Sequence, residues 1–246
     1  MISVDVGSGS VRVALTSFTN GNTSVAKVLA SESKVTTTHN PHPDWYEQST
    51  SEIWSAVVHC IRECLKKTGT NSVDGIAFTA TCSLVVVGPK SCSSPGTVYE
   101  GENDIIMWMD HRSVREAANI SATKDELLNQ VGGVCSPEFS LAKLSWLREN
   151  SKRRFDSSIA FMELPDYLTW KCLISPDNSD HQNLLLYRPS SCSVVCKWFY
   201  DTINDEWSKR LMTKIGLDCL LQEGYIRIGG KLSIFCAIFC FYVSPI

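Results

Sequence analysis

The chain has 246 residues, a formal net charge of −3, 43% hydrophobic residues and 20% charged residues. These values are ordinary for a globular protein, and this length allows one large domain or two small ones with a substantial core. Without an excess of basic residues, the chain offers no electrostatic surface for nucleic acid or for an anionic membrane. A small molecule or another protein is therefore the expected partner.

The cysteines and the first residues predict a cytoplasmic protein. Eleven cysteines are scattered along the chain without a C-x-x-C pair, and no nearby histidines suggest a zinc site. The chain opens with Met-Ile-Ser-Val-Asp-Val-Gly, which lacks the basic and apolar segments of a secretory signal. We therefore expect reduced thiols and no disulfide framework.

Hydrophobic periodicity predicts alternating strands and helices. Three strands are expected within residues 2–33, and a helix begins at the capping-box sequence of residues 49–52 and ends near Gly69. The later pattern predicts strands at 73–78, 84–87, 105–108 and 159–164, and helices at 112–131, 141–147, 166–173 and 205–215; residues 194–200 fit either type. Early antiparallel strands followed by mixed elements indicate an α/β layer architecture.

The last residues differ in character from the rest. Residues 232–246 carry no charge and show no helical or strand period. The segment is too short and too interrupted to span a bilayer comfortably, so a membrane anchor is the less favoured alternative. We expect residues 1–230 to form the folded domain and residues 231–246 to be a non-native apolar tail, such as read-through past an exon boundary.

The most specific local motif runs from Asp5 to Arg12, with glycines at 7 and 9 and serines at 8 and 10. A tight hairpin with two glycines lets backbone N–H groups approach an anion, because no Cβ intervenes. The Asp5 carboxylate can hold Mg²⁺ through water, while Ser10 adds a hydroxyl and Arg12 a positive charge. The motif is neither a Walker loop nor a dinucleotide-binding fingerprint. An ordinary glycine hairpin with an incidental aspartate remains the alternative.

This motif resembles the first phosphate loop of the actin-like ATPases and sugar kinases, and further segments select the FGGY carbohydrate kinases among them. Six segments occur in the order of that family: residues 5–12, 45–48, 75–83, 108–112, 143–150 and 164–168. The Ala-Thr-Cys-Ser sequence ending at Ser83 and Cys196-Lys197-Trp198 are similar to the ribulokinase-like branch. That branch usually has Asp where this chain has Thr79, so the sequence does not name the sugar.

The resemblance implies a ribonuclease-H-like α/β domain, with a mixed five-stranded sheet, helices on both faces and a substrate-side insertion. It also implies ATP- and Mg²⁺-dependent phosphorylation of a hydroxyl of a sugar or polyol, with a ketopentose such as ribulose as the expected acceptor. Asp5 would position Mg²⁺–ATP, and the hairpin formed by Gly7, Ser8, Gly9 and Ser10, with Arg12, would hold the transferred phosphate.

The substrate residues follow from the same resemblance. Thr81, Cys82 and Ser83 would line the sugar pocket, unless they form only a turn between core strands. Asp110 and Arg112 would either clamp sugar hydroxyls or form a structural ion pair. Lys197 would reach the ketopentose, unless it is a surface lysine. The segment of residues 45–48 would pin the loop over the pocket, and Asp166 would be structural, in the first turn of a helix.

The resemblance places the catalytic general base and a second domain beyond the point where this chain enters its apolar tail. No catalytic base is therefore expected within the chain, and weak or no kinase turnover is the expected outcome. The alternative is a non-catalytic product that binds sugar or associates with full-length subunits. Dimerisation that covers the exposed interdomain face is also expected.

Overall fold

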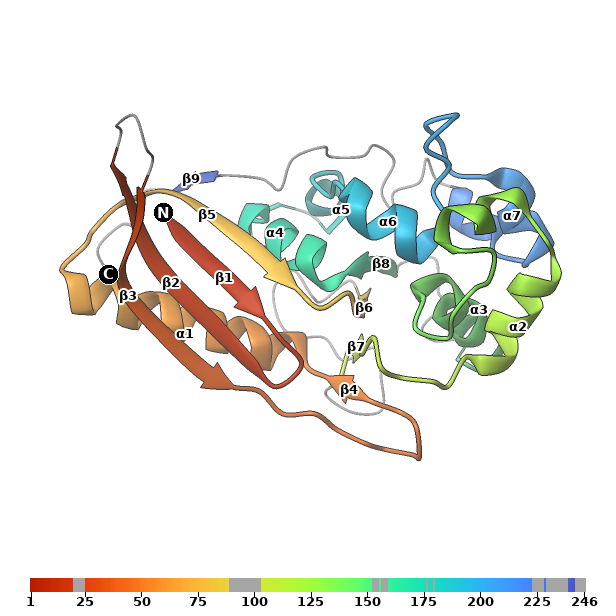
Figure 1. The fold of residues 1–246 in the computed structure, drawn as a ribbon, viewed down its shortest axis with the longest axis horizontal. Helices are drawn as coiled ribbons and strands as arrows, with labels where there is room; N and C mark the ends of the chain where they lie inside the picture. Colours follow the sequence, from red (N-terminus) through yellow and green to blue (C-terminus); the bar gives the residue numbers. More distant parts are fainter. Residues whose placement is uncertain are drawn as a thin grey trace. The chain divides into compact units, whose positions relative to one another are not determined.

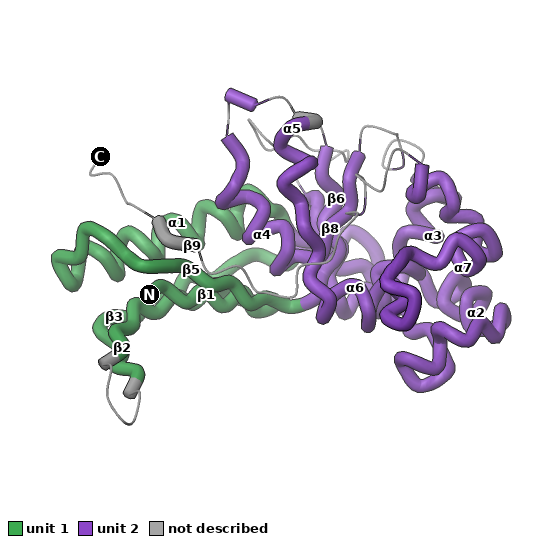
Figure 2. The backbone as a smooth tube through the Cα atoms, turned by 90° about the horizontal axis from the view of Figure 1, so that it is seen from above, with its two compact units in different colours: residues 1–38, 49–81, 235–246 green, residues 39–48, 82–234 purple. Residues whose placement is uncertain are grey.

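The chain divides into two units, each with its own sheet (Figure 2). Unit 1 contains Met1–Thr38, Ser49–Thr81 and Phe235–Ile246, and unit 2 contains His39–Gln48 and Cys82–Ile234. The computed structural model describes residues 1–19, 25–88, 103–151, 155, 159–175, 177–178, 180–222, 228 and 239–241. The domain predicted at residues 1–230 thus contains parts of both units.

The sheet of unit 1 is mixed and five-stranded, as the family resemblance implies (Figure 1). Its strands are β1 (Ile2–Val6), β2 (Ser10–Thr19), β3 (Val25–Val35), β5 (Val73–Ala80) and β9 (Phe239–Phe241). They lie in the order β3-β2-β1-β5-β9; β1 and β5 are parallel, and the other neighbours are antiparallel. Most of the predicted tail lies outside the described residues, but β9 comes from it and pairs with β5.

Helix α1 (Thr50–Thr68) covers one face of this sheet. Its apolar side chains pack against the alternate inward-facing residues of the first strands, which include Ile2, Val4, Val6, Val11, Val13 and Leu15. Gly69, with φ of 65°, ends the helix in the left-handed conformation that glycine adopts easily. Among the described residues α1 is the one helix of unit 1, and the other described helices belong to unit 2.

Helix α1 begins where the capping-box sequence predicts, but the hydrogen bonds of a capping box are not formed. Ser49 occupies the N-cap position but makes no side-chain cap hydrogen bond. The Glu52 carboxylate instead accepts hydrogen bonds from the backbone N–H and the hydroxyl of Thr37, at 3.0 and 2.9 Å. Glu52 therefore fastens the segment after β3 to α1, a tertiary contact that the local S-x-x-E pattern does not reveal.

Unit 2 contains an antiparallel four-stranded sheet with strand order β4-β7-β6-β8. Its strands are β4 (Glu47–Gln48), β6 (Leu84–Val87), β7 (Ile105–Ile106) and β8 (Ala160–Glu163). Its helices are α2 (Val114–Ala122), η2 (Glu126–Val131), α3 (Ser140–Asn150), α4 (Leu164–Leu173), α5 (Asp180–Leu184), α6 (Ser191–Trp198), α7 (Lys209–Lys214) and η4 (Asp218–Leu221). A large core built from β6, β8, α2, α3, α6 and α7 fills this unit.

Two predicted helices of unit 2 differ from the structure. The helix predicted at 112–131 breaks after α2, because Lys124 takes a φ of 50° and the Asp125 side chain caps η2. The helix predicted at 205–215 shortens to α7, because the preceding residues form a turn closed by a bridge between Asp201 and Glu206. The ambiguous segment at 194–200 lies largely in α6.

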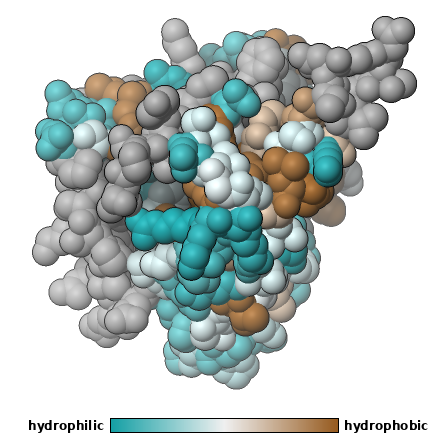
Figure 3. Space-filling view, turned by 90° about the vertical axis from the view of Figure 1, so that its left-hand side faces the viewer, coloured by the Kyte–Doolittle hydropathy of each residue, from teal (hydrophilic) through white to brown (hydrophobic). Residues whose placement is uncertain are grey.

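The part of the chain that the structure describes contains no helix both long enough and apolar enough to cross a membrane. Exposed large apolar side chains include Phe18 and Leu29, which border one hollow of unit 1, and residues elsewhere such as Val114 and Ile203. Figure 3 shows brown, apolar residues interrupted by hydrophilic ones on the face that it presents. Scattered exposure of this kind is normal for a protein surface.

Candidate functional site

The Asp5 carboxylate lies near the carboxyl end of β1, on the sheet face opposite α1. Val4 and Val6 point inward and are buried, whereas the Asp5 side chain is 47% exposed. Arg12 lies directly across the β1–β2 ladder and donates from Nε and Nη2 to Asp5 Oδ2, at 2.9 and 2.5 Å. Among the described residues no hydrogen bond reaches Oδ1, so this oxygen can accept one from water bound to a magnesium ion.

The two glycines of the hairpin have different surroundings. The Gly7 N–H donates to the Ser10 carbonyl at 2.9 Å, and a Cβ added at Gly7 would lie 2.9 Å from Arg12 Nη2. A Cβ added at Gly9 would meet no described atom within 4 Å. A side chain at Gly7 would therefore displace the end of the Arg12 side chain, whereas Gly9 leaves open space through which a phosphate group can approach the backbone.

A hollow of about 520 Å³ borders the Asp5–Arg12 pair. Its other charged residues, Glu32 and Lys67, pair with each other, and its remaining lining side chains are small: Ser3, Val13, Ala14, Ser31 and Ser33. Among the described residues no cluster of three or more His, Cys, Asp or Glu side chains could hold a metal. A single carboxylate nevertheless suits Mg²⁺, which keeps most of its waters and binds phosphate oxygens. These residues fit a magnesium-bound phosphate.

Thr81 follows β5 and lies beside the hairpin within unit 1. Its N–H donates to the Val6 carbonyl at 3.0 Å, at the carboxyl ends of the parallel strands β1 and β5. Its hydroxyl is buried and has no hydrogen-bond partner among the described residues. Thr79, the departure from the branch pattern, is exposed directly across from Asp5. Ligands of open α/β sheets bind at the carboxyl ends of the strands, so Thr81 and the hairpin share the favoured edge.

The Asp110–Arg112 pair is buried inside unit 2. Arg112 Nε and Nη2 donate to the two carboxylate oxygens of Asp110 at 2.9 and 2.7 Å, and Nη2 also donates to Glu47 at 2.8 Å. The guanidinium carbon lies 4.1 Å from the ring centroid of Trp45 and 5.2 Å from that of Trp146. The arginine side chain is 0% exposed. This geometry favours the structural ion pair over direct contact with a sugar.

The remaining predicted substrate residues, Cys82, Ser83 and Lys197, all belong to unit 2. Burial raises the pKa of the half-buried Cys82 thiol to about 12, and the nearby positive charge of Lys197 acts in the opposite direction. Ser83 is fully buried, and its hydroxyl accepts a hydrogen bond from the Trp108 N–H at 3.2 Å. The Lys197 ammonium lies 5.2 Å from the centroid of the Phe139 ring. Cys82 and Lys197 thus lie near each other, and at neutral pH the thiol is uncharged.

Sequence reasoning missed Glu163, a buried carboxylate at the end of β8. It pairs in register with Leu84, directly after the Cys82–Ser83 segment. It accepts hydrogen bonds from Trp198 Nε1 at 2.6 Å and from the Ser140 hydroxyl, and burial raises its pKa. A glutamate that ends a short apolar run carries no sequence signal of its own, since its partners come from α3 and α6.

Asp166 lies near the start of a helix, as predicted, but its environment is unusual for a carboxylate. It lies in the first turn of α4, is 7% exposed, and accepts a hydrogen bond from the Ser190 N–H at 3.2 Å. Burial raises the pKa of the Asp166 carboxyl from 3.8 to about 7. In the unfolded chain this group loses its proton near pH 4, whereas the folded chain retains it until about pH 7. Stability should therefore fall as the pH rises through this window.

We expect Asp166→Asn to remove this pH dependence, because the amide cannot ionise. Between pH 4.5 and 7.5, the unfolding free energy of the unmodified chain should fall relative to that of the variant by about 2–4 kcal/mol. Urea unfolding at both pH values measures the difference. Asp74→Asn, at an exposed carboxylate of β5, is the control and should follow the unmodified chain. Parallel pH profiles for Asp166→Asn and the unmodified chain would contradict the assignment.

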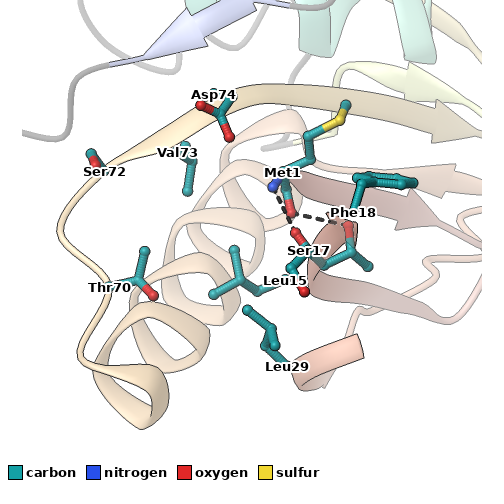
Figure 4. A pocket seen from close by; sticks show the side chains of 10 residues that line it. Met1, Leu15, Ser17, Phe18, Leu29, Thr70, Ser72, Val73 and Asp74 are labelled. Carbon is teal, nitrogen blue, oxygen red and sulfur yellow. Dashed lines mark hydrogen bonds between the residues drawn. The ribbon is translucent and has the colours of Figure 1, made fainter. Parts of the chain in front are cut away.

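A second hollow, of about 430 Å³, lies at the other end of the unit 1 strands (Figure 4). Leu15, Phe18 and Leu29 provide apolar walls, and the Met1 amino group donates to the Thr16 carbonyl at 2.8 Å. This hollow lies beside the amino end of β1, away from the strand ends that carry the hairpin and Thr81. It contains none of the residues that the sequence singled out.

Comparison with known proteins identifies relatives of both the sequence and the fold. Residues 1–184 match the family model described as the FGGY family of carbohydrate kinases, N-terminal domain. The chain is 35% identical over 236 residues to a Danio rerio protein named FGGY carbohydrate kinase domain-containing protein, and 33% identical over 242 residues to a D-ribulokinase of Saccharomyces cerevisiae. Each match covers 94% of this chain, but only 39% and 31% of the respective relative.

Solved structures show the same fold. A xylulose kinase from Rhodospirillum rubrum matches with a TM-score of 0.69 at 18% identity, over 87% of this chain and 41% of that one. A glycerol kinase from Plasmodium falciparum, solved with ADP, matches with a TM-score of 0.66 at 15% identity, over 88% of this chain and 40% of that one.

Proposed function

Because the chain belongs to the FGGY family of carbohydrate kinases, we propose that it provides the amino-terminal part of an ATP-dependent sugar kinase. In this proposal Asp5 and the Gly7–Ser10 hairpin receive the phosphate end of Mg²⁺–ATP, and the acceptor is a hydroxyl of a sugar or polyol. The chain spans less than half the length of the curated relatives that it matches. The activity of a complete kinase is therefore part of the proposal.

The observation that carries the proposal is the geometry at the carboxyl ends of β1 and β5. A half-exposed carboxylate, an arginine bonded to one of its oxygens, and an open glycine backbone meet at one strand end. Mg²⁺ bound there would neutralise phosphate charge, which is the main requirement of phosphoryl transfer. The phosphate would be positioned by the chain's own groups, namely Asp5, the N–H groups of the hairpin and Arg12.

For the acceptor we propose a ketopentose such as ribulose. The similarity to a yeast D-ribulokinase supports this choice. Cys82 and Lys197 supply a half-buried face of unit 2 whose groups can contact sugar hydroxyls. Asp110 and Arg112 act on this face indirectly, since their ion pair is wholly buried and fixes the segment that follows Trp108.

A thermal-shift panel of ketopentoses and polyols, with and without Mg²⁺–ATP, tests the proposal. A ligand present at 100 times its Kd stabilises the folded state by about 2.7 kcal/mol, so its melting temperature should rise by several degrees. We expect shifts with ribulose and with Mg²⁺–ATP, and none with ATP in EDTA. A shift with sugar alone would contradict the nucleotide site and leave a sugar-binding role. No shift with any ligand would refute the whole assignment.

A further inference from the structure

Lys143 is a wholly buried cation in the middle of an apolar helix face. It lies in α3, where Leu141, Leu144 and Leu147 fill the core of unit 2, and it is itself 1% exposed. Among the described residues no carboxylate lies within ion-pair distance of its ammonium group. Nζ instead donates to two backbone carbonyls, that of Glu138 at 2.9 Å and that of Trp108 at 3.2 Å.

The Trp108 carbonyl belongs to a longer series of hydrogen bonds. The N–H of the same residue donates to the buried hydroxyl of Ser83 at 3.2 Å. The backbone of Trp108 is therefore held on its amino side by the Cys82–Ser83 segment and on its carbonyl side by α3, while its side chain is half-buried. One lysine thus links the proposed sugar-binding segment to a helix that begins more than fifty residues later.

Core stability alone does not explain a lysine at this position. Removing an ammonium group from water is unfavourable, and backbone carbonyls repay that cost only in part. An apolar side chain would suit the neighbouring leucines better. Four charged groups lie close enough to act on the charge of Lys143: the carboxylates of Asp110, Glu138 and Glu163, and the ammonium group of Lys197, which acts in the opposite direction. None of the three carboxylates forms an ion pair with Lys143. A lysine can donate hydrogen bonds to these two carbonyl groups, and an apolar residue cannot.

We propose that Lys143 is a positioning residue for sugar recognition, which holds the Trp108 backbone and, through Ser83, the adjacent Cys82 segment in their binding geometry. The inference rests on the proposed function, since it concerns the same sugar-binding face. Lys143 does not touch the sugar, because its side chain is buried. Its effect is on the placement of the Trp108 backbone and of the Cys82 segment joined to it through Ser83, and small misplacements of a binding group cost large factors in affinity or rate.

Fluorine NMR of the full chain labelled with 5-fluorotryptophan tests the placement directly. The chain has seven tryptophans, and the variant Trp108→Phe identifies the Trp108 signal. In Lys143→Met we expect this signal to shift or broaden, while the signals of tryptophans in the distant part of the core stay in place. Ser83→Ala, which releases the other side of the same peptide, should disturb the same signal without removing a buried charge. Lys143→Arg should restore it in part.

Calorimetric titration with ribulose provides the second readout. Affinity should fall about tenfold or more in Lys143→Met, with a smaller loss in Lys143→Arg. Leu147→Ala is the matched control on α3: a cavity should lower its melting temperature, but its Trp108 signal and its ribulose affinity should match those of the unmodified chain. If Lys143→Met does not fold, Lys143→Arg and Ser83→Ala decide the outcome.

The two hypotheses fail in different ways. An unchanged Trp108 signal in the Lys143 and Ser83 variants would overturn the positioning role, whatever the affinity. A disturbed Trp108 signal with unchanged ribulose affinity would also overturn it, since the tether would then be purely structural. If the unmodified chain does not bind ribulose, the proposed substrate fails, and the NMR comparison still shows whether the tether exists.

Discussion

Replacing Arg112 with methionine should destabilise the chain by about 3–5 kcal/mol, the largest effect that we expect from a single substitution. The guanidinium group carries the positive charge between Asp110 and Glu47, at 2.7 and 2.8 Å. Methionine would leave two buried carboxylates without a counter-charge, and Trp45 and Trp146 would lose their cationic neighbour. Urea denaturation followed by tryptophan fluorescence measures the loss.

Arg115→Met provides the matched control for Arg112→Met. Arg115 lies three residues further along and also bonds to two carboxylates, Glu116 and Glu149, but its side chain is 66% exposed. Glu149 is exposed as well, whereas Glu116 is 3% exposed. Because solvent reaches the arginine itself and screens its charge, its loss should lower the denaturation midpoint far less than the loss of Arg112. Equal effects of the two substitutions would show that burial does not decide the strength of these pairs, and our account of Arg112 would be wrong.

Replacing Asp5 with asparagine should abolish the magnesium dependence of nucleotide binding and weaken the affinity for Mg²⁺–ATP by about tenfold or more, which is at least ~1.4 kcal/mol. The carboxylate is the group of the hairpin that can hold the ion's water shell, and an amide carries no charge to do so. Titration with a fluorescent ATP analogue, with Mg²⁺ and with EDTA, measures both effects. The fold should survive, because Asp5 is half exposed.

Gly9→Ala tests the phosphate side of the same site. Nothing described lies within 4 Å of a Cβ at Gly9, so the substitution should leave the melting temperature nearly unchanged while the methyl group obstructs the approaching phosphate. Ser31→Ala, at an exposed serine of β3 that lines the same hollow, should bind nucleotide normally. If Asp5→Asn and Gly9→Ala both bind Mg²⁺–ATP as tightly as the unmodified chain, the hairpin does not receive the phosphate.

The strands near the Gly7–Ser10 hairpin could be predicted because their pattern is local. Alternation of apolar residues in β1 already requires Asp5 to face away from Val4 and Val6, and the glycines mark the turn. The end of α1 at Gly69 was also predicted, since a glycine after an apolar periodic run favours a left-handed cap. In these cases the signal and the structure lie within a few residues of each other.

The break in the helix predicted at 112–131 is less local. An apolar period continues through it, but Arg210 and Lys214 from α7 pair with the buried Asp125 side chain just where η2 begins. Those partners are 85 and 89 residues away in sequence. The apolar periodicity of a predicted helix cannot show that two cations far away in sequence pair with Asp125 and hold it at the N-cap of η2.

The sequence by itself determined the family, the open hairpin and the side of the sheet on which Asp5 lies, because glycine geometry and strand alternation act over a few residues. Only the tertiary structure decided that Arg112 is enclosed by Glu47 and two tryptophans, and that Lys143 reaches the Trp108 carbonyl. Burial and hydrogen-bond partners depend on contacts between segments far apart along the chain. A charged residue of one type can therefore either contact a ligand or make buried ion pairs and hydrogen bonds inside the protein. The packing around the residue determines which of the two occurs.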